Sequence, residues 1–470
     1  MRGIVPSKPP AKHLTTGRTR RALKVGTLTT QVGGSYLLNA LKRPFQSEDR
    51  QKQETLDTHL RNALLIVERS KELKGAFMKL LQMLSMRHDL FPPEVLEIFS
   101  VTQSQVPPMP YAMIRRQVEK ELGKPPEKLF ASFEQEAFAA ASLGQVHRAT
   151  LHSGETVAVK IQYPGVDETV GQDLKNVKAL LQTFTVIGRD VLRQKIDSDE
   201  LYQELEERLG EELDYEHEAR NLELFREMFA DDDEVVIPSC HTDLTSRRVI
   251  TLSFVEGYPL SEFLLPHVDQ DLKDWVAIKY FRVLWRQIFE FGTLHTDPHP
   301  GNYLVTFHPR LAMLDFGSIR IFPEEIRAAY LKLARALLDH DHAEAARQCV
   351  VLDYIDRDDD PAPMLEMLET ILDPVLEDVG DYDPRHYDSV ERGMKVATIA
   401  LEKRVFKAPG HRVFFLRALI GLDSYLQQFG TVTNYHRLIE QCVAEAEERT
   451  AGRRATRPAR GARRGGGGQR

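Results

Sequence analysis

The stretch His295-Thr296-Asp297-Pro298-His299-Pro300-Gly301-Asn302 holds the densest set of chemically capable residues in the chain, and thirteen positions after Asn302 comes Asp315-Phe316-Gly317. Mg²⁺ prefers oxygen ligands and shares them with phosphate groups. Asn302 and Asp315 are therefore candidate magnesium ligands, and Asp297 is a candidate for orienting an attacking hydroxyl group or water. Asp-Phe-Gly alone is a common turn, so the prediction depends on the paired spacing of the two fragments.

Upstream of this stretch, a lysine ends a predicted strand, Val157-Ala158-Val159-Lys160. A cation at that position can contact the α- and β-phosphates of a nucleotide. Glu212, Asp214 and Glu218 lie on one predicted helix and can pair with Lys160 in the lysine–glutamate manner of kinases. Taken alone, three acidic residues on a helix more often form a solvated face. The order of the surrounding motifs is what favours the pairing.

These elements follow the order of protein kinases: strand lysine, helix glutamate, a hinge at Glu256-Gly257, the Asp…Asn loop and Asp-Phe-Gly. In detail the sequence resembles the UbiB/ADCK/AarF family of atypical kinases more closely. The resemblance is carried by an alanine-rich loop over 139–147, a KxGQ-like motif Lys79-Leu80-Leu81-Gln82, an ExD-like motif Glu212-Leu213-Asp214 and the catalytic-loop fragment over 297–302. Specific motifs cover 73–316, and looser similarity continues to about residue 430.

The resemblance implies an α+β, atypical protein kinase-like fold with a small antiparallel-sheet N-lobe, a helical C-lobe and an N-terminal helical extension. It implies ATP and Mg²⁺ as cofactors, with Asn302 and Asp315 as the metal ligands. The implied catalytic residues are Asp297, Lys160, Glu218, Lys79, Glu212 and Asp214. The implied nucleotide-binding residues are Ala139, Ala140, Ala141, Ser142 and Lys160.

Within this family pattern, Lys79 reaches the site and meets Glu212 or Asp214, and its helix lies over the cleft and excludes a protein substrate. Leu81 stands where the motif has glycine, which puts a tight helix contact in doubt. Alanine pays a steric penalty at positive φ, so an alanine loop is expected to present its amides to phosphates differently from a glycine loop. Replacing Ala140 with glycine tests this through ATP and ADP affinity.

The function implied is an ATP- and Mg²⁺-dependent atypical kinase or ATPase. It acts on or near a lipid-like small molecule and supports isoprenoid quinone (ubiquinone) biosynthesis. One alternative is a protein Ser/Thr kinase, although no Ala-Pro-Glu follows Gly317. Another is a nucleotide-binding pseudokinase scaffold, although all three metal-site residues are present. The enzymatic interpretation requires Lys160, Asn302 and Asp315 to converge on one polyphosphate and its ion.

Periodicity predicts the organisation of the chain. We expect a basic segment over 1–50, a helical extension over 51–125, the N-lobe over 126–256, the C-lobe over 257–448 and a disordered basic tail over 449–470. A helix is predicted over 111–122, ending at Gly123. Strands over 145–151 and 156–162 flank a hairpin turn at Ser153-Gly154. Strands over 235–237 and 248–254 close the N-lobe, and the chain beyond is mainly helical apart from 295–316.

The composition is that of a globular protein, with 42% hydrophobic and 28% charged residues. Three widely spaced cysteines argue against a disulfide framework and indicate a reducing compartment. The four histidines His88, His147, His152 and His217 have no companions at metal-ligand spacing and are interpreted as structural or solvated. His295 and His299 are interpreted as scaffolds for Asp297. Trp275 and Trp285 are expected in the core.

The net charge of -8 conceals two basic termini, and the first 46 residues contain no acidic side chain. The uncharged stretch over 25–41 is too polar and too short to span a bilayer. It is predicted to lie on an anionic membrane surface, to dock on the body, or to belong to a mitochondrial presequence. We expect a cytoplasmic, bacterial protein, peripheral at the inner membrane, with a mitochondrial location left open. ATP and ADP are the expected partners, no nucleic acid is expected, and the oligomeric state is not predicted.

Overall fold

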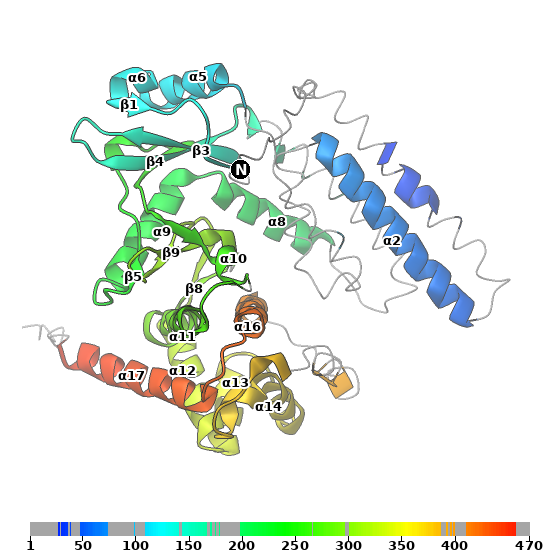
Figure 1. The fold of residues 1–470 in the computed structure, drawn as a ribbon. Coiled ribbons are helices and arrows are strands. Elements are labelled where there is room, and N and C mark those ends of the chain that lie inside the picture. The colour runs from blue at the N-terminus through cyan, green and yellow to red at the C-terminus, as the bar shows by residue number, and fades with distance from the viewer. Residues whose placement is uncertain are drawn as a thin grey trace, which may run out of the picture. The chain divides into compact units, whose positions relative to one another are not determined.

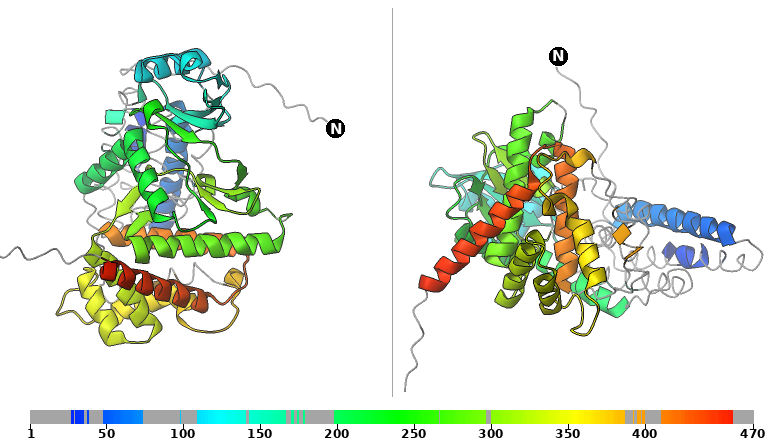
Figure 2. Two further views of the ribbon diagram at one scale, coloured as in Figure 1. Left: turned by 90° about the vertical axis from the view of Figure 1, so that its left-hand side faces the viewer. Right: turned by 90° about the horizontal axis from the view of Figure 1, so that it is seen from below.

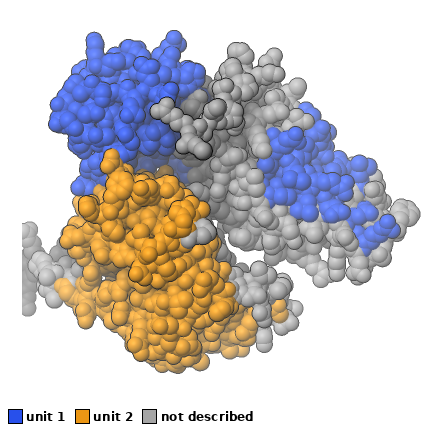
Figure 3. Space-filling view, viewed as in Figure 1, with its two compact units in different colours: residues 1–226, 238–254 blue, residues 227–237, 255–470 orange. Residues whose placement is uncertain are grey.

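The computed structural model describes residues 27–28, 30–35, 38, 48–73, 98, 109–140, 143–166, 170–171, 174, 178, 198–265, 267–296, 300–386, 392, 395–396, 398–399 and 410–456. The chain divides into two compact units, Met1–Arg226 with Pro238–Phe254 and Glu227–Ile237 with Val255–Arg470. Figure 3 distinguishes them by colour. Each unit is described by itself.

The first unit contains a five-stranded antiparallel sheet. Strands β1 (Ser132–Phe133), β3 (Gly144–Thr150), β4 (Thr156–Gln162) and β6 (Val249–Ser253) follow one another, and β2 (Ala139–Ala140) pairs with β3. The turn between β3 and β4 contains Gly154 at φ 91°, a conformation that glycine adopts without penalty. The predicted hairpin is confirmed, with strand ends within one residue of those expected.

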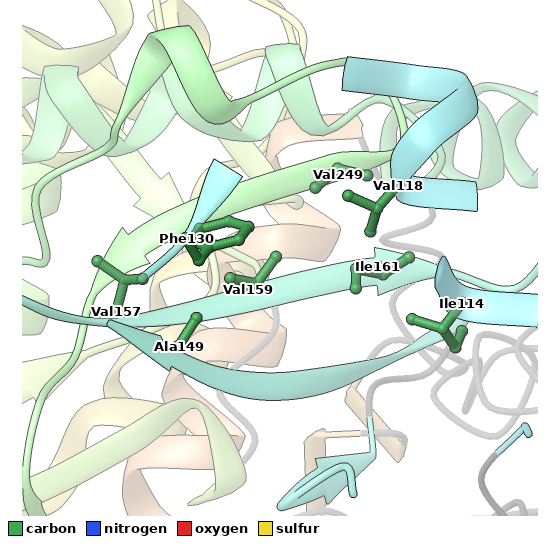
Figure 4. Packing of buried hydrophobic residues seen from close by; sticks show 8 residues of the cluster. All are labelled: Ile114, Val118, Phe130, Ala149, Val157, Val159, Ile161 and Val249. Carbon is green, nitrogen blue, oxygen red and sulfur yellow. The ribbon is translucent and has the colours of Figure 1, made fainter. Parts of the chain in front are cut away.

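Helices cover one face of this sheet. Helix α5 (Tyr111–Leu122) ends at Gly123 in the left-handed conformation, as predicted, and is followed by the short helix α6 (Pro126–Leu129). Apolar side chains from these helices and from alternate strand positions form one core (Figure 4). Its fully buried members are Ile114, Val118, Phe130, Ala149, Val157, Val159, Ile161 and Val249. Alternation along β4 places Ala158 and Lys160 on the opposite face.

Further helices precede the sheet in the sequence or lie between its strands β4 and β6. Helix α2 (Glu48–Leu73) has 26 residues and falls in the predicted helical extension. Helices α8 (Ser198–Glu212) and α9 (Tyr215–Met228) follow β4, and the turn η3 (Thr242–Leu244) precedes β6. The KxGQ-like motif, with Lys79, lies outside the described residues.

The second unit contains two small sheets. Strands β5 (Val235–Val236), β10 (Leu311–Met313), β9 (Tyr303–Thr306) and β7 (Gly257–Pro259) form one, and β8 (Thr293–His295) pairs with β11 (Ile319–Ile321) in the other. The prediction that the strand at 235–237 closes the N-lobe was wrong, because β5 pairs in parallel with β10. The stretch over 295–316, which was expected to be irregular, contains β9 and β10, and β8 and β11 lie at its two ends.

The rest of the second unit is helical (Figures 1 and 2). Helix α11 (Gln270–Arg286) continues into the π-helical turn η4 (Gln287–Phe291), and it lies beside α16 (Gly410–Phe429) and α17 (Tyr435–Thr456). Trp285 of α11 is 3% exposed, as expected for a core residue, whereas Trp275 is half-buried. The elements are α10 (Leu260–Phe263), α11 (Gln270–Arg286), η4 (Gln287–Phe291), η5 (Pro300–Asn302), α12 (Glu324–Leu338), α13 (His342–Val351), α14 (Ala362–Leu376), η6 (Pro384–His386), α16 (Gly410–Phe429) and α17 (Tyr435–Thr456). The prediction that disorder begins at residue 449 was wrong, because α17 continues to Thr456.

A charge network holds the segment Glu227–Ile237 in the second unit. Asp232 accepts from Lys279 Nζ at 2.7 Å and from Arg286 Nη1 at 3.0 Å, and Asp231 accepts from Arg286 Nη2 at 2.9 Å. Two of the three acids at 231–233 therefore have partners within the chain. Within the described part, none of the helices combines the length and the apolar character needed to cross a bilayer.

Candidate functional site

The strand lysine and the helix glutamate form an ion pair inside the first unit. Lys160 Nζ lies 3.0 Å from Glu218 Oε1 and 3.1 Å from Oε2, and 5.0 Å from the centre of the Tyr215 ring. The Glu218 side chain is 3% exposed and that of Lys160 is 17% exposed. The pairing implied by the resemblance is thus present, while the contact of Lys160 with phosphates stays a prediction.

Asp214 positions Glu218 by beginning helix α9. Its Oδ1 accepts the His217 N–H at 3.0 Å, and its carbonyl oxygen accepts the Glu218 N–H at 3.1 Å. This is the capping role that aspartate serves at helix N-termini, where the first amides have no partner within the helix. Glu212 lies in the last turn of α8 and is half-buried. The prediction that Glu212, Asp214 and Glu218 lie on one helix was wrong, because the chain leaves the helix between α8 and α9, where Asp214 caps the second helix. The contact of Glu212 or Asp214 with Lys79 stays a prediction.

Apolar side chains surround Lys160 on its face of the sheet, although Arg148 lies beside Ala158 on the same face, and the sequence interpretation missed these neighbours. The strand register sets Val146 and Ile250 on either side of Lys160, and Leu252 beside Ala158. Val146 and Ala158 are half-buried, and the two β6 side chains are buried. The alternating pattern of β4 could have indicated this face, because every second residue lies opposite the core.

The alanine-rich loop leads into the sheet through β2. Ala139 pairs with Val146 and Ala140 with Gln145, so both alanines are extended, and neither has a positive φ. The expected steric penalty therefore does not arise at these two residues; Ala141 and Ser142 lie outside the described residues. Gly144 permits a close approach of β3 to β4, because a Cβ there would lie 2.3 Å from the Ile161 carbonyl oxygen.

Two side chains of β3, Gln145 and His147, form a series of hydrogen bonds with each other and with two backbone groups. The Met109 N–H donates to Gln145 Oε1 at 2.7 Å, Gln145 Nε2 donates to His147 Nε2 at 2.8 Å, and His147 Nδ1 donates to the Glu134 carbonyl oxygen at 2.8 Å. This assignment requires the neutral imidazole, because Nε2 must accept. Burial lowers the pKa of His147 accordingly. The structural interpretation of His147 is confirmed.

Asn302 and Asp315 are brought together inside the second unit by the β9–β10 hairpin. Tyr303 pairs with Met313, and one step outward the Leu314 N–H donates to the Asn302 carbonyl oxygen at 2.9 Å. Asp315 follows directly, and its Oδ1 accepts the Gly317 N–H at 3.0 Å. The two predicted metal ligands thus lie at the same end of two neighbouring strands.

His295 fixes the backbone around Asp315. Its Nε2 lies 2.5 Å from the Asp315 carbonyl oxygen, its N–H donates to Gln287 Oε1 at 2.8 Å, and the residue is 3% exposed. Thr296 donates its N–H to the Ser318 carbonyl oxygen at 2.9 Å. His295 is therefore a structural residue that holds the backbone of Asp315, and its predicted role as a scaffold for Asp297 stays a prediction. Asp297 and His299 lie outside the described residues.

The donor set at the hairpin end fits magnesium. Asn302 offers an amide oxygen and Asp315 a carboxylate, and Mg²⁺ takes one or two such protein ligands while water and phosphate oxygens complete its octahedron. Lys160 and Glu218 belong to the first unit and Asn302 and Asp315 to the second. The convergence of the two halves on one nucleotide stays a prediction.

The chain has the arrangement of a protein kinase. A lysine–glutamate pair lies beside a small antiparallel sheet, and a hairpin that carries Asn302 and Asp315 follows in the sequence. Residues 101–349, just over half of the chain, match the ABC1 atypical kinase-like domain. The chain belongs to the ABC1 atypical kinase-like family, which is the UbiB/ADCK/AarF family of the resemblance.

Individual relatives agree with this assignment. The chain is 37% identical over 333 residues to Protein ACTIVITY OF BC1 COMPLEX KINASE 3, chloroplastic, of Arabidopsis thaliana, covering 69% of this chain and 46% of that protein. It is 30% identical over 343 residues to Atypical kinase COQ8B, mitochondrial, of Danio rerio, covering 72% and 54%. The chain therefore spans about half the length of these curated relatives.

A solved structure supports the fold. The complex of Rv3197 with erythromycin from Mycobacterium tuberculosis matches with a TM-score of 0.59 and 24% identity, covering 84% of this chain and 98% of that one. At this identity the likeness concerns the fold alone. The predicted kinase-like α+β fold is confirmed.

Proposed function

We propose that the chain binds ATP with Mg²⁺ and either transfers the terminal phosphoryl group or hydrolyses ATP. The observation that carries this proposal is the buried Lys160–Glu218 pair. A buried charge is costly unless it is paired, so the Glu218 carboxylate, which is 3% exposed, holds the Lys160 ammonium in a fixed position. The names of two relatives, which call them atypical kinases, support the same conclusion.

In this proposal, residues of each unit have separate roles. Glu218 holds the Lys160 ammonium, which would neutralise phosphate charge when a nucleotide is bound. Asn302 and Asp315 hold the metal ion, which shields the negative charge of the phosphates when it is bound. Asp297 orients the attacking hydroxyl group or water. We keep a lipid-like small molecule as the proposed acceptor and isoprenoid quinone biosynthesis as the proposed context, both drawn from the family resemblance.

Phosphate release from ATP with Mg²⁺, with and without anionic liposomes, tests the proposal. We expect turnover by the unaltered chain, stimulated by liposomes if the acceptor site lies at a membrane. Asp315→Asn should lower turnover by about 100-fold, because it removes a charged metal ligand. Asp381→Asn, at an exposed position, is the matched control and should change nothing. Equal background release from all three proteins would favour a nucleotide-binding scaffold instead.

A further inference from the structure

The π-helical turn η4 joins the core helix α11 to the strand that leads to the candidate metal ligands. The Gly292 N–H donates to the Gln287 carbonyl oxygen, so the bond spans five residues instead of the four of an α-helix. Single π-helical turns are rare and occur frequently at functional sites. The side-chain contacts of this turn, all within the second unit, indicate what it holds in place.

The side chain of Gln287 supplies an acceptor that the small sheet lacks. Strand β8 pairs with β11 alone among the described strands. The Thr296 N–H donates to the Ser318 carbonyl oxygen on the β11 side, and successive amides of a strand point to opposite edges. The His295 N–H therefore points to the unpaired edge of β8, where it donates to Gln287 Oε1 at 2.8 Å. Gln287 is 2% exposed, so this bond is shielded from water.

Arg327 of helix α12 holds the end of the turn. Its Nη1 donates to the Phe289 carbonyl oxygen at 2.5 Å, and its Nε and Nη2 donate to the two carboxylate oxygens of Glu324 at 2.7 Å and 2.6 Å. The stem of Arg327 packs over Gly292, where an added Cβ would lie 3.0 Å from Arg327 Cβ. The planar guanidinium fork fixes the direction of its N–H groups. The turn is therefore fixed relative to α12.

His295 connects Gln287 to Asp315. A carbonyl oxygen can only accept, so His295 Nε2 donates to the Asp315 carbonyl oxygen at 2.5 Å. Asp315 Oδ1 accepts the Gly317 N–H at 3.0 Å. A shift of the His295 backbone would move its ring and, with the ring, the peptide that bears the Asp315 carboxylate. A continuous series of hydrogen bonds thus links the π-helical turn to this carboxylate.

We propose that Gln287 is a positioning residue for the Asp315 carboxylate and acts through His295, with Arg327 and the π-helical turn holding Gln287 in place. The inference rests on the proposed function, in which Asp315 is a metal ligand. Residues that orient metal ligands typically contribute about 10- to 100-fold to metal affinity or activity. Loss of the Gln287 acceptor should therefore weaken the use of Mg²⁺ more than the binding of ATP, because Lys160 has no part in this series of bonds.

Amide hydrogen exchange, measured without metal or nucleotide, gives the first test. Gln287→Leu keeps most of the side-chain volume and has no hydrogen-bonding atom. It should speed exchange over residues 311–318, which include the Gly317 amide bonded to Asp315, by roughly tenfold, since a buried amide loses its acceptor. Gln348→Leu is the matched control: Gln348 of α13 is 8% exposed, and its Nε2 donates to Glu344 Oε1 at 2.7 Å. It should leave residues 311–318 unchanged.

The Mg²⁺ dependence of phosphate release gives the second test. Gln287→Leu should need roughly tenfold more Mg²⁺ for the half-maximal rate, while the KM for ATP at saturating Mg²⁺ stays within about twofold. A defect in folding alone would lower the maximal rate without changing this Mg²⁺ requirement. Arg327→Lys removes the planar fork and should shift both measurements in the same direction. It replaces Gln287→Leu if circular dichroism shows that Gln287→Leu does not fold.

Four results would overturn the inference. They are unaltered exchange over residues 311–318 in folded Gln287→Leu, faster exchange confined to residues 287–296, an unchanged Mg²⁺ requirement with only a lower maximal rate, and an equal effect of Gln348→Leu. Absence of phosphate release from the unaltered chain would instead refute the proposed function. The exchange measurement would then still decide whether Gln287 positions Asp315.

Discussion

Replacing Glu218 with glutamine should destabilise the first unit strongly although it changes only a few atoms. The carboxylate is 3% exposed and bonds Lys160 Nζ through both oxygens. Removing one partner of a buried ion pair costs about 3–5 kcal/mol, because the other charge stays buried without compensation. Lys160 retains 17% exposure, which places the expected loss near the lower limit, at about 3 kcal/mol.

Amide hydrogen exchange measured on peptides of β4 and α9 reports this loss locally. A loss of about 3 kcal/mol corresponds to exchange roughly 100-fold faster for amides that open with this unit. Glu223→Gln is the matched control, because Glu223 pairs with Arg226 on the same helix with side chains 52% and 41% exposed. An exposed pair of this kind contributes at most about 1 kcal/mol.

A double-mutant cycle separates the ion pair from general damage to the helix. Lys160→Met removes the stranded charge, so the double variant with Glu218→Gln should regain part of the protection that Glu218→Gln alone loses. The reasoning is refuted if Glu218→Gln speeds exchange no more than Glu223→Gln does. It is also refuted if the two substitutions at the pair are simply additive.

Two further predictions concern the support of this pair. Asp214→Ala should destabilise α9 by about 1 kcal/mol through loss of the cap to His217, whereas Asp214→Asn keeps a capping oxygen and should exchange like the unaltered chain. A drop in ATP turnover for Asp214→Asn would then require a role for the charge itself, and faster α9 exchange in that variant would contradict the capping role. His147 is neutral in the folded chain, where burial lowers its pKa. As the pH falls below about 6.5, the ordinary pKa of histidine, this side chain therefore binds a proton in the unfolded chain before it does so in the folded chain. The free energy of unfolding should therefore decrease as the pH falls below that value. His147→Gln should make this decrease smaller than in the control His152→Gln, as measured by unfolding followed by circular dichroism. An unchanged pH dependence in His147→Gln would exclude His147 as its source.

Local features of the fold were predictable because their causes lie within a few residues. Gly154 and Gly123 mark a turn and a helix end by backbone freedom alone, and the alternation along β4 separates core positions from the face of Lys160. The strand at 235–236 shows the limit. Its apolar residues suit either sheet, and only the distant β10, together with Lys279 and Arg286, determines its place.

Within the candidate site, the sequence indicated residue types but not how they are supported. Gln145 lies in the alanine-rich loop fragment over 139–147, which the sequence analysis identified. Its side chain links the Met109 backbone amide to His147, and this link depends on contacts between segments that are distant in sequence. Capping by Asp214 had a sequence signal, an aspartate shortly before a helical repeat, but the resemblance drew attention to its charge instead. Both residues therefore have structural functions that a substitution experiment must separate from catalytic ones.

The spacing of thirteen residues between Asn302 and Asp315 acquires a physical meaning in the hairpin. Two antiparallel strands return the chain to its starting edge, so residues that flank the first and last paired positions must become neighbours. The bond from the Leu314 N–H to the Asn302 carbonyl oxygen extends the ladder by one step and leaves Asp315 as the first residue beyond it. A one-residue deletion in the turn between β9 and β10 would shift this register and turn one of the two side chains to the opposite face. The hairpin length is therefore as much a requirement of the proposed metal site as its two ligands are.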